Sequence, residues 1–383
     1  MFKNPGFVEE KAELVAFASL PGIRHRHIRD ALTLFGSPAG AWEAVRGGFW
    51  SRHAHGGEGP EWRDLARRLE PAAHLQALVC GGTMALAVGE AGYPELLREI
   101  HDPPWIIFCR GNVPPPGAPC VAVVGSRKAT PYGLEAAHSL ARDLAINGVW
   151  VVSGAAYGVD ASAHRGALQA KGLTAAVLGC GTDVVYPRPN ANLLREIESA
   201  GCLLSEYPQG TQPLKHHFPA RNRIIAGMSL ATLVVEASMT SGALLTAEFA
   251  MSEGRDVCAV PGPISSSNSK GTNRLIKNGA ALVSTVDDIL DELGIERRVD
   301  PAAPRLPIDP GGPESALLKA LEGGATGIED LTGRVGMTVR EALSRLSGLE
   351  VSGLVRRAPG GRYYLAAAAL PPVRPGRDDA QGR

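Results

Sequence analysis

The stretch "KHHFPARNRIIAG", residues 215–227, gathers the side chains with the clearest chemical potential in the chain. Pro219 suits the first turn of a helix, so we expect a helix that begins near Phe218. In that register Phe218, Arg221 and Asn222 lie on one face of the helix. An aromatic ring beside a guanidinium group and a helix N-terminus is suited to stacking a nucleobase while holding phosphates.

Several members of this stretch keep a second interpretation open. Phe218 can equally be a core aromatic at a helix start, and Arg223 lies off the shared face, where an ion pair would be its ordinary role. His216 and His217 could ligate a metal only with further partners at ligand spacing, and the sequence offers none. We therefore predict no metal site.

Short apolar runs that alternate with amphipathic helical stretches must position these side chains. Between Cys120 and about Leu293 the runs are "CVAVVG", "VWVVSG", "TAAVLGCG", "CLLSEYP", "ATLVVEA" and "DVCAVPG". This rhythm is typical of a mostly parallel, doubly wound sheet with helices on both faces, so the predicted fold class is α/β. In such open sheets ligands bind outside the carboxyl ends of the strands.

The turns that follow these runs are rich in glycine and small hydroxyl residues, as in "GSRKATPYG", "SGAAYGVD", "GCGTDVVYPRPN" and "EASMTSGA". Backbone N–H groups in such turns can approach a ligand closely, and helix N-termini add partial positive charge. Arg127 and Lys128 add full charges in the first turn, and Lys215 lies at the same edge. One glycine turn alone would indicate tight packing, but several along one edge predict an anion site. Neither GxGxxG at the first turn nor GxxxxGK[ST] anywhere is present, which excludes a dinucleotide fingerprint and a Walker A loop.

Four carboxylates near this edge are the candidates for catalysis: Asp160, Asp183, Glu206 and Glu236. Asp160 and Glu236 can equally cap helices or pair with Arg221 or Arg223. No Gly-x-Ser-x-Gly elbow and no nucleophile–base pair occurs, so binding is favoured over catalysis and no catalytic residue is predicted.

Composition limits the class of protein. The 39 basic and 39 acidic side chains cancel, so any polyanion must be bound by local patches rather than by a global field. The six cysteines form no CxxC pair and most lie in apolar, strand-like runs, which favours buried free thiols. Without a signal-like start or a long apolar run, the chain is expected to be cytoplasmic, with no membrane partner.

At 383 residues the chain is long enough for two or three domains. The predicted divisions are a helical domain at 8–79, a lead-in segment at 80–119, the α/β domain at 120–295, a linker at 296–312, a small domain at 313–370 and a disordered tail at 371–383. In the small domain, three helical stretches precede a hairpin that turns at Pro359-Gly360-Gly361. That order suggests a winged helix, which could read DNA or dock a protein.

Six ordered blocks from Cys120 to Val283 resemble the DNA processing protein A (DprA, or Smf) family. They are "VAVVGSRKATPYG", "VVSGAAYGVDASAHRGAL", "AVLGCGTDVVYPRPNANL", "SEYPQGTQPLKHHFPARNRIIAGMS", "VVEASMTSGALLTAEFA" and "AVPGPISSSNSKGTNRLIKNGA", and "YPELLREIHDPPWIIFCRGN" extends the likeness upstream. The resemblance implies a Rossmann-like domain that binds single-stranded DNA and loads the RecA recombinase onto it, in natural transformation or recombinational repair. It also implies a homodimer that works without cofactor or catalytic turnover.

The same resemblance assigns roles by motif. Gly125, Ser126 and Arg127 would clamp phosphate. Lys215 would contact phosphate, and Phe218 would stack on a base. The remaining implied DNA contacts are Arg221, Asn222 and Arg223 in the same block, Ser153, Gly154 and Gly158 in the adjacent turn, and Thr240 and Ser241 across from it. The implied dimer or recombinase contacts are Leu275, Ile276 and Lys277.

The flanking regions and two other functions complete the expectations. "LPGIRHRHIRDALTLFGSP" is similar to a family accessory module related to helix-hairpin-helix (HhH) or sterile alpha motif (SAM) domains, although Arg24 stands where a DNA-binding hairpin prefers glycine. One alternative is a nucleotide phosphoribohydrolase of the lysine decarboxylase-like type, whose PGGxGTxxE block "GCGTDVV" does not reproduce. The other is a nucleotide-sensing winged-helix regulator, against which the nearly neutral small domain argues.

Overall fold

The computed structural model describes residues 10–49, 59–297, 312–322, 324, 326–351, 354–358 and 361–365. The chain divides into two compact units, residues 1–299 and 300–383. Within the described ranges, no helix combines the length and the apolar character needed to cross a bilayer.

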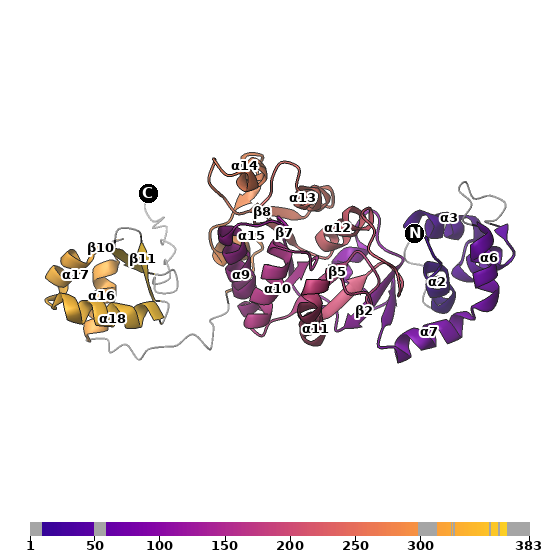
Figure 1. Ribbon diagram of the computed structural model, residues 1–383, viewed down its shortest axis with the longest axis horizontal. Coiled ribbons are helices and arrows are strands. Elements are labelled where there is room, and N and C mark those ends of the chain that lie inside the picture. The colour runs from indigo at the N-terminus through magenta and orange to yellow at the C-terminus, as the bar shows by residue number, and fades with distance from the viewer. Residues whose placement is uncertain are drawn as a thin grey trace, which may run out of the picture. The chain divides into compact units, whose positions relative to one another are not determined.

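A nine-stranded sheet is the scaffold of the first unit (Figure 1). Its strands lie in the order β1-β2-β6-β5-β4-β3-β7-β8-β9. Their bounds are Met84–Ala87 (β1), Ile106–Gly111 (β2), Cys120–Val124 (β3), Trp150–Ser153 (β4), Thr174–Leu178 (β5), Cys202–Ser205 (β6), Ala231–Val234 (β7), Asp256–Ala259 (β8) and Ala281–Leu282 (β9). All neighbours from β6 to β9 are parallel, and β1 and β2 are antiparallel additions at one edge. The predicted Rossmann-like, mostly parallel sheet is confirmed.

Helices cover both faces of the sheet because successive strand side chains point to opposite sides. On β3, Val121 and Val123 enter one core, whereas Cys120 and Ala122 enter the other. The helix bounds are Glu95–Arg98 (α8), Pro131–Ile146 (α9), Val159–Gln169 (α10), Ala191–Ala200 (α11), His217–Gly227 (α12), Gly242–Ser252 (α13), Lys270–Lys277 (α14) and Val286–Glu292 (α15). Helices α9 and α15 pack into the first core, and α12 and α13 pack into the second.

Residues 84–111 differ from their prediction as a lead-in segment, because they supply two strands of the same sheet. β2 pairs with β6 from Phe108 opposite Ser205 to Gly111 opposite Cys202. The run Ile106–Phe108 is fully buried, and β2 contacts both α11 and the N-terminal helix Lys11–Ala18 (α2). A strand that is covered on both faces has no polar alternation, so its apolar run alone does not reveal its neighbours.

The N-terminal helices extend the core that lies on the α12 side of the sheet. Their bounds are Lys11–Ala18 (α2), His25–Phe35 (α3), Pro38–Arg46 (α4), Gly59–Arg68 (α6) and Pro71–Cys80 (α7). Phe17, Trp42 and Trp62 are buried in one apolar cluster with the residues of β1 and β2. Helical structure is thus observed throughout the described part of residues 8–79, and these helices share a core with the sheet.

The second unit contains the predicted winged helix. Its elements are Pro313–Leu321 (α16), Thr326–Gly327 (β10), Ile328–Val335 (α17), Val339–Val351 (α18), Val355–Ala358 (β11) and Arg362–Leu365 (β12). The strands form a three-stranded sheet in the order β10-β12-β11. Leu317, Leu331, Leu346 and Tyr363 close a separate apolar core.

The cysteines are all free, and five of the six are buried. Cys80, at the end of α7, is the exposed one. This distribution confirms the prediction that most cysteines are buried thiols.

Candidate functional site

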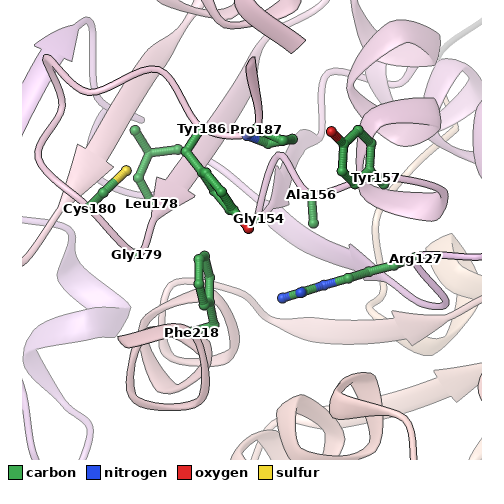
Figure 2. A pocket seen from close by; sticks show the side chains of 10 residues that line it. All are labelled: Arg127, Gly154, Ala156, Tyr157, Leu178, Gly179, Cys180, Tyr186, Pro187 and Phe218. Carbon is green, nitrogen blue, oxygen red and sulfur yellow. The ribbon is translucent and has the colours of Figure 1, made fainter. Parts of the chain in front are cut away.

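Phe218 and Arg127 face each other at a pocket outside the carboxyl ends of β3, β4 and β5 (Figure 2). The guanidinium carbon of Arg127 lies 5.2 Å from the centre of the Phe218 ring. Arg127 is exposed and Phe218 is half-buried. The remaining lining residues are Gly154, Ala156, Tyr157, Leu178, Gly179, Cys180, Tyr186 and Pro187. A cation beside an aromatic face can bind a nucleotide, because the base can stack on the ring while the phosphate pairs with the cation.

Two exposed tyrosines at this pocket were not predicted. Tyr157 is 46% exposed and Tyr186 is 39% exposed, and both stand across the pocket from Phe218 (Figure 2). The Tyr186 ring centre lies 5.5 Å from that of Phe218, with the two planes tilted by 36°. The sequence did carry a signal for them, since each aromatic side chain lies in a strand-end turn beside glycine or proline, and such connecting segments run over the surface.

Arg221 lies beneath the pocket and not in it. Its side chain donates hydrogen bonds to the carbonyl oxygens of Gly154, at 3.0 Å, and Val177, and the residue is 3% exposed. A Cβ atom on Gly154 would lie 2.6 Å from the guanidinium nitrogens, so glycine is required for this close approach. Burial lowers the pKa of Arg221 to about 10, which leaves it charged at neutral pH. The helix face that carries Arg221 packs onto the sheet, so this geometry favours a structural role, and the contact of Arg221 with a DNA strand stays a prediction.

The turn after β4 is held by internal hydrogen bonds. The buried carboxylate of Asp160 accepts hydrogen bonds from the backbone N–H groups of Gly154, at 3.2 Å, and Ala156, at 3.4 Å. Burial raises the pKa of Asp160, and the nearby Arg221 charge opposes that shift. Asn190 donates to the carbonyl oxygen of Ala155 at 3.0 Å. Asp160 thus acts as a structural acceptor that fixes the loop carrying Tyr157.

Arg223 forms the ion pair that was its alternative role. Its Nη2 lies 2.6 Å from Oε1 of Glu206, and its Nε lies 3.5 Å from Oδ2 of Asp102. The side chain of Arg223 is only 11% exposed. Because Glu206 and Asp102 already balance the positive charge of Arg223, little of that charge is left to attract a strand phosphate. The ion pairs favour a role for Arg223 as an anchor for α12, and its contact with DNA stays a prediction.

The histidines of the stretch have structural partners. His217 donates from Nδ1 to the carbonyl oxygen of Gly179 at 3.1 Å. Its ring stacks on Tyr207, with centroids 3.9 Å apart. Across the described ranges of the chain, no three His, Cys, Asp or Glu side chains gather in a way that could hold a metal ion. His217 therefore fixes the start of α12, one residue earlier than predicted.

Glu236 occupies the helix end where a Rossmann enzyme would hold the phosphates of a dinucleotide. Its carboxylate accepts hydrogen bonds from the backbone N–H of Thr130, at 2.8 Å, and from the Thr130 hydroxyl, at 2.6 Å. A Cβ atom on Gly133 would lie 2.4 Å from that carboxylate. Helix N-termini attract anions, and the N-terminus of α9 is already satisfied by this carboxylate. The Asp183 carboxylate likewise has a structural partner, the N–H of Gly210 at 2.9 Å.

The other predicted residues differ in how far they are exposed. Arg127, Lys215 and Thr240 are exposed, and Ser126, Asn222 and Ser241 are half-buried near the same strand ends. Ser153 is buried and donates to the carbonyl oxygen of Val123 at 2.7 Å, so its side chain supports the sheet instead of facing a ligand. Asn222 donates to the carbonyl oxygen of Gly242 at 3.3 Å, and Ser241 accepts from the N–H of Ala243 at 3.3 Å.

The predicted glycines lie at turns of the same edge, since Gly125 follows β3 and Gly158 precedes α10. Leu275 and Ile276 are half-buried and Lys277 is exposed on α14, away from this pocket's lining.

Two family models match the chain. "DNA recombination-mediator protein A" matches residues 84–294, and "DprA winged helix domain" matches residues 301–361. The putative DNA processing protein DprA of Mycobacterium tuberculosis (strain H37Rv) is 43% identical over 252 residues, which cover 65% of each chain. The protein Smf of Escherichia coli (strain K12) is 38% identical over 283 residues, which cover 72% of this chain and 76% of Smf. The chain thus spans just under two thirds of the length of the mycobacterial relative.

Two solved structures share the fold. The X-ray structure of DprA from Streptococcus pneumoniae has 36% sequence identity and a TM-score of 0.62, and the match covers 73% of this chain and 97% of that one. A Helicobacter pylori DprA structure, described as giving insights into that protein's single-stranded DNA binding mode, has 30% identity and a TM-score of 0.50. The match to it covers 56% of this chain and 97% of that one.

Proposed function

Because this chain belongs to the DNA recombination-mediator protein A family, we propose that it binds single-stranded DNA at the carboxyl edge of its sheet and processes DNA in natural transformation. The observation that carries the proposal is the contact between Arg127 and Phe218, with Tyr157 and Tyr186 across the pocket. Bases stack on aromatic side chains regardless of sequence, and exposed cations follow the phosphates. The single-stranded DNA binding described for the Helicobacter pylori relative supports the same class of ligand.

The partners follow from the family and remain part of the proposal. We propose that the chain loads the RecA recombinase onto the bound strand, acts as a homodimer in the cytoplasm and has no catalytic turnover. Leu275, Ile276 and Lys277 on α14 stay our candidates for partner contacts. The carboxylate of Glu236 at the N-terminus of α9 disfavours the nucleotide-enzyme alternative, since it takes the place of a phosphate there.

Replacing Arg127 or Lys215 by alanine is expected to weaken oligo-dT binding in a salt-dependent manner. Each neutralised phosphate on a single strand contributes a slope of about −0.7 to log K against log salt. We expect each variant to flatten the slope by about 0.7 if its cation neutralises one phosphate. Fluorescence anisotropy over a salt series measures this. Arg142→Ala is the matched control, because Arg142 is a half-buried arginine in the last turns of α9, where it pairs with Asp143. If the salt slope is unchanged in both variants, neither Arg127 nor Lys215 neutralises a strand phosphate.

Truncation after Asp309 separates the strand binder from the winged-helix regulator. The first unit is compact without the second, which has its own core. We expect residues 1–309 to retain oligo-dT affinity within about threefold of the full chain, since all the lining residues of the pocket lie before residue 219. Anisotropy on both chains, with a duplex of equal length as competitor, gives the comparison. Loss of binding in the truncated chain, while its thermal unfolding stays cooperative, would favour the regulator.

A further inference from the structure

Four charged side chains from four separate segments meet where α3 approaches α12. His25 Nε2 lies 2.9 Å from Oδ1 of Asp102, and His25 Nδ1 lies 3.5 Å from Oε1 of Glu206. Arg223 contacts the same two carboxylates from the other side. Cations and anions therefore alternate around a ring. We call His25, Asp102, Glu206 and Arg223 the α3–α12 cluster.

The charge of this cluster balances only when His25 is protonated. The two carboxylates and Arg223 sum to one net negative charge, in a site where the side chains of His25 and Arg223 are each 11% exposed. A buried ion whose partner is removed is strongly destabilising. Burial lowers the pKa of His25, but the hydrogen bond to Asp102 and the closeness of Glu206 outweigh it, so the pKa is raised above its ordinary value. Burial likewise opposes ionisation of Asp102, yet His25 and Arg223 lower its pKa to about 2.

The cluster bears directly on the position of α12. Arg223 is five residues after Phe218 on the same helix, about 7–8 Å along its axis. α12 has no acidic residue in its first turn and no side-chain N-cap, so its intrinsic stability is low and tertiary contacts must hold it. Its start is fixed by His217 on Gly179 and its middle by Arg223 in the cluster. A change at His25 is thus transmitted to the helix that carries Phe218.

We propose that His25 is a positioning residue for the strand site, acting through Asp102, Glu206 and Arg223 so that the N-terminal helices set the placement of α12. This inference rests on the proposed single-stranded DNA binding. It gives the N-terminal helices a task that needs no DNA contact of their own. His25 also stacks on Trp105 at 5.6 Å, with the ring planes 19° apart, which fixes the imidazole orientation.

The pH dependence follows from the groups that face His25. Asp102 and Trp105 face it from the segment before β2, Glu206 faces it from the end of β6, and Arg223 lies beyond the two carboxylates on α12. Tyr93 interacts electrostatically with Glu206 and Arg223. On its own helix the neighbouring cations, Arg24 and Arg26, are exposed. A raised folded-state pKa means that stabilisation by His25 is complete below 6.5, its ordinary value, and is lost as the pH rises through the raised value.

The test compares the full-length wild type with His25→Gln and His74→Gln. His74 is the matched control, because it is a half-buried N-terminal histidine that contacts Ser19 and has its pKa lowered by burial. For His25→Gln we expect the Kd for oligo-dT to be about fivefold higher than that of the wild type at pH 5.5, which is a modest coupling between distinct sites. At pH 8.5 the two Kd values should approach each other, because the wild type has then lost the charge of His25. The difference in urea unfolding midpoint between the wild type and His25→Gln should likewise be large at pH 5.5 and small at pH 8.5. His217, whose pKa burial lowers, is present in all three chains, so its titration cancels in the ratio to wild type.

A further variant keeps the inference testable if His25→Gln folds poorly. His25→Lys retains a permanent cation while the wild type loses its own as the pH rises, so the ratio of the variant's Kd to the wild-type Kd should fall by about fivefold between pH 5.5 and 8.5. A Kd penalty in His25→Gln that is equal at both pH values, or a closing midpoint gap without any Kd change, would overturn the positioning role. If the wild type binds no oligonucleotide at either pH, both the proposed function and the coupling to it are rejected. The pH dependence of the urea midpoint then still tests whether His25 stabilises the α3–α12 cluster.

Discussion

Phe218→Ala is expected to weaken oligo-dT binding by about 1–3 kcal/mol, or roughly 5- to 150-fold, with little change in the salt slope. The ring contributes through stacking, which is largely uncharged and so releases few counterions. Its loss also removes the surface against which Arg127 rests and to which Tyr186 is tilted. Anisotropy with an oligo-dT at several salt concentrations yields both the affinity and the slope.

Two further substitutions separate stacking from simple apolar burial. Phe218→Trp keeps an aromatic face and should bind within about threefold of wild type, whereas Phe218→Leu keeps apolar bulk without a π-face and should resemble alanine. Because Phe218 is half-buried near the start of α12, each variant also requires an unfolding curve. Wild-type affinity in a folded Phe218→Ala chain would sink the assignment of this pocket to a nucleobase.

The central strands could be predicted because their sequence carries both required signals. β3 to β8 are short apolar runs, and most end in a glycine-rich or polar turn, so the location of the edge followed from the parallel topology. β1 and β2 lacked that signal. Phe108 pairs with Ser205, almost a hundred residues away, and such a register depends on long-range contacts that a local pattern does not contain.

The helical register placed Phe218 and Arg221 correctly on α12 but could not say what covers each of them. Periodicity specifies the relative direction of side chains and leaves open which direction faces solvent. Arg221 points to a sheet whose Gly154 leaves room for a guanidinium, a coincidence of two residues 67 positions apart. Arg223 depended in the same way on Glu206 and on Asp102, which is 121 positions distant.

The three functional directions of α12 explain why this stretch is so rich in unusual side chains. Phe218 faces the pocket, and Arg221 supports the floor of the pocket from below. Arg223 ties the helix to Glu206 and Asp102, which in turn contact His25 of α3. Only the first of these has a surface that a ligand can reach. Cationic residues near a candidate DNA site therefore divide into those that meet phosphate and those that build the platform, and burial is what separates them.

Arg221→Met is expected to lower the free energy of unfolding of the first unit by about 2–6 kcal/mol. The substitution removes a donor from two buried carbonyl oxygens, those of Gly154 and Val177, at about 1–3 kcal/mol each. It also removes the positive charge near Asp160, whose pKa burial already raises. Urea unfolding followed by tryptophan fluorescence measures the loss. Methionine keeps the length of the apolar stem, so most of the effect comes from the missing guanidinium.

The same variant decides whether Arg221 supports the site or contacts the strand. As a support, Arg221→Met should leave the salt slope of oligo-dT binding unchanged at a low temperature where the variant is fully folded, although its affinity can fall as the β4 turn loosens. As a phosphate contact, it would flatten the slope by about 0.7 and cost little stability. Arg127→Ala provides the opposite reference, because Arg127 is exposed and donates to no backbone carbonyl in the described part of the chain. A flattened slope with unchanged stability in Arg221→Met would return this buried arginine to the list of strand contacts.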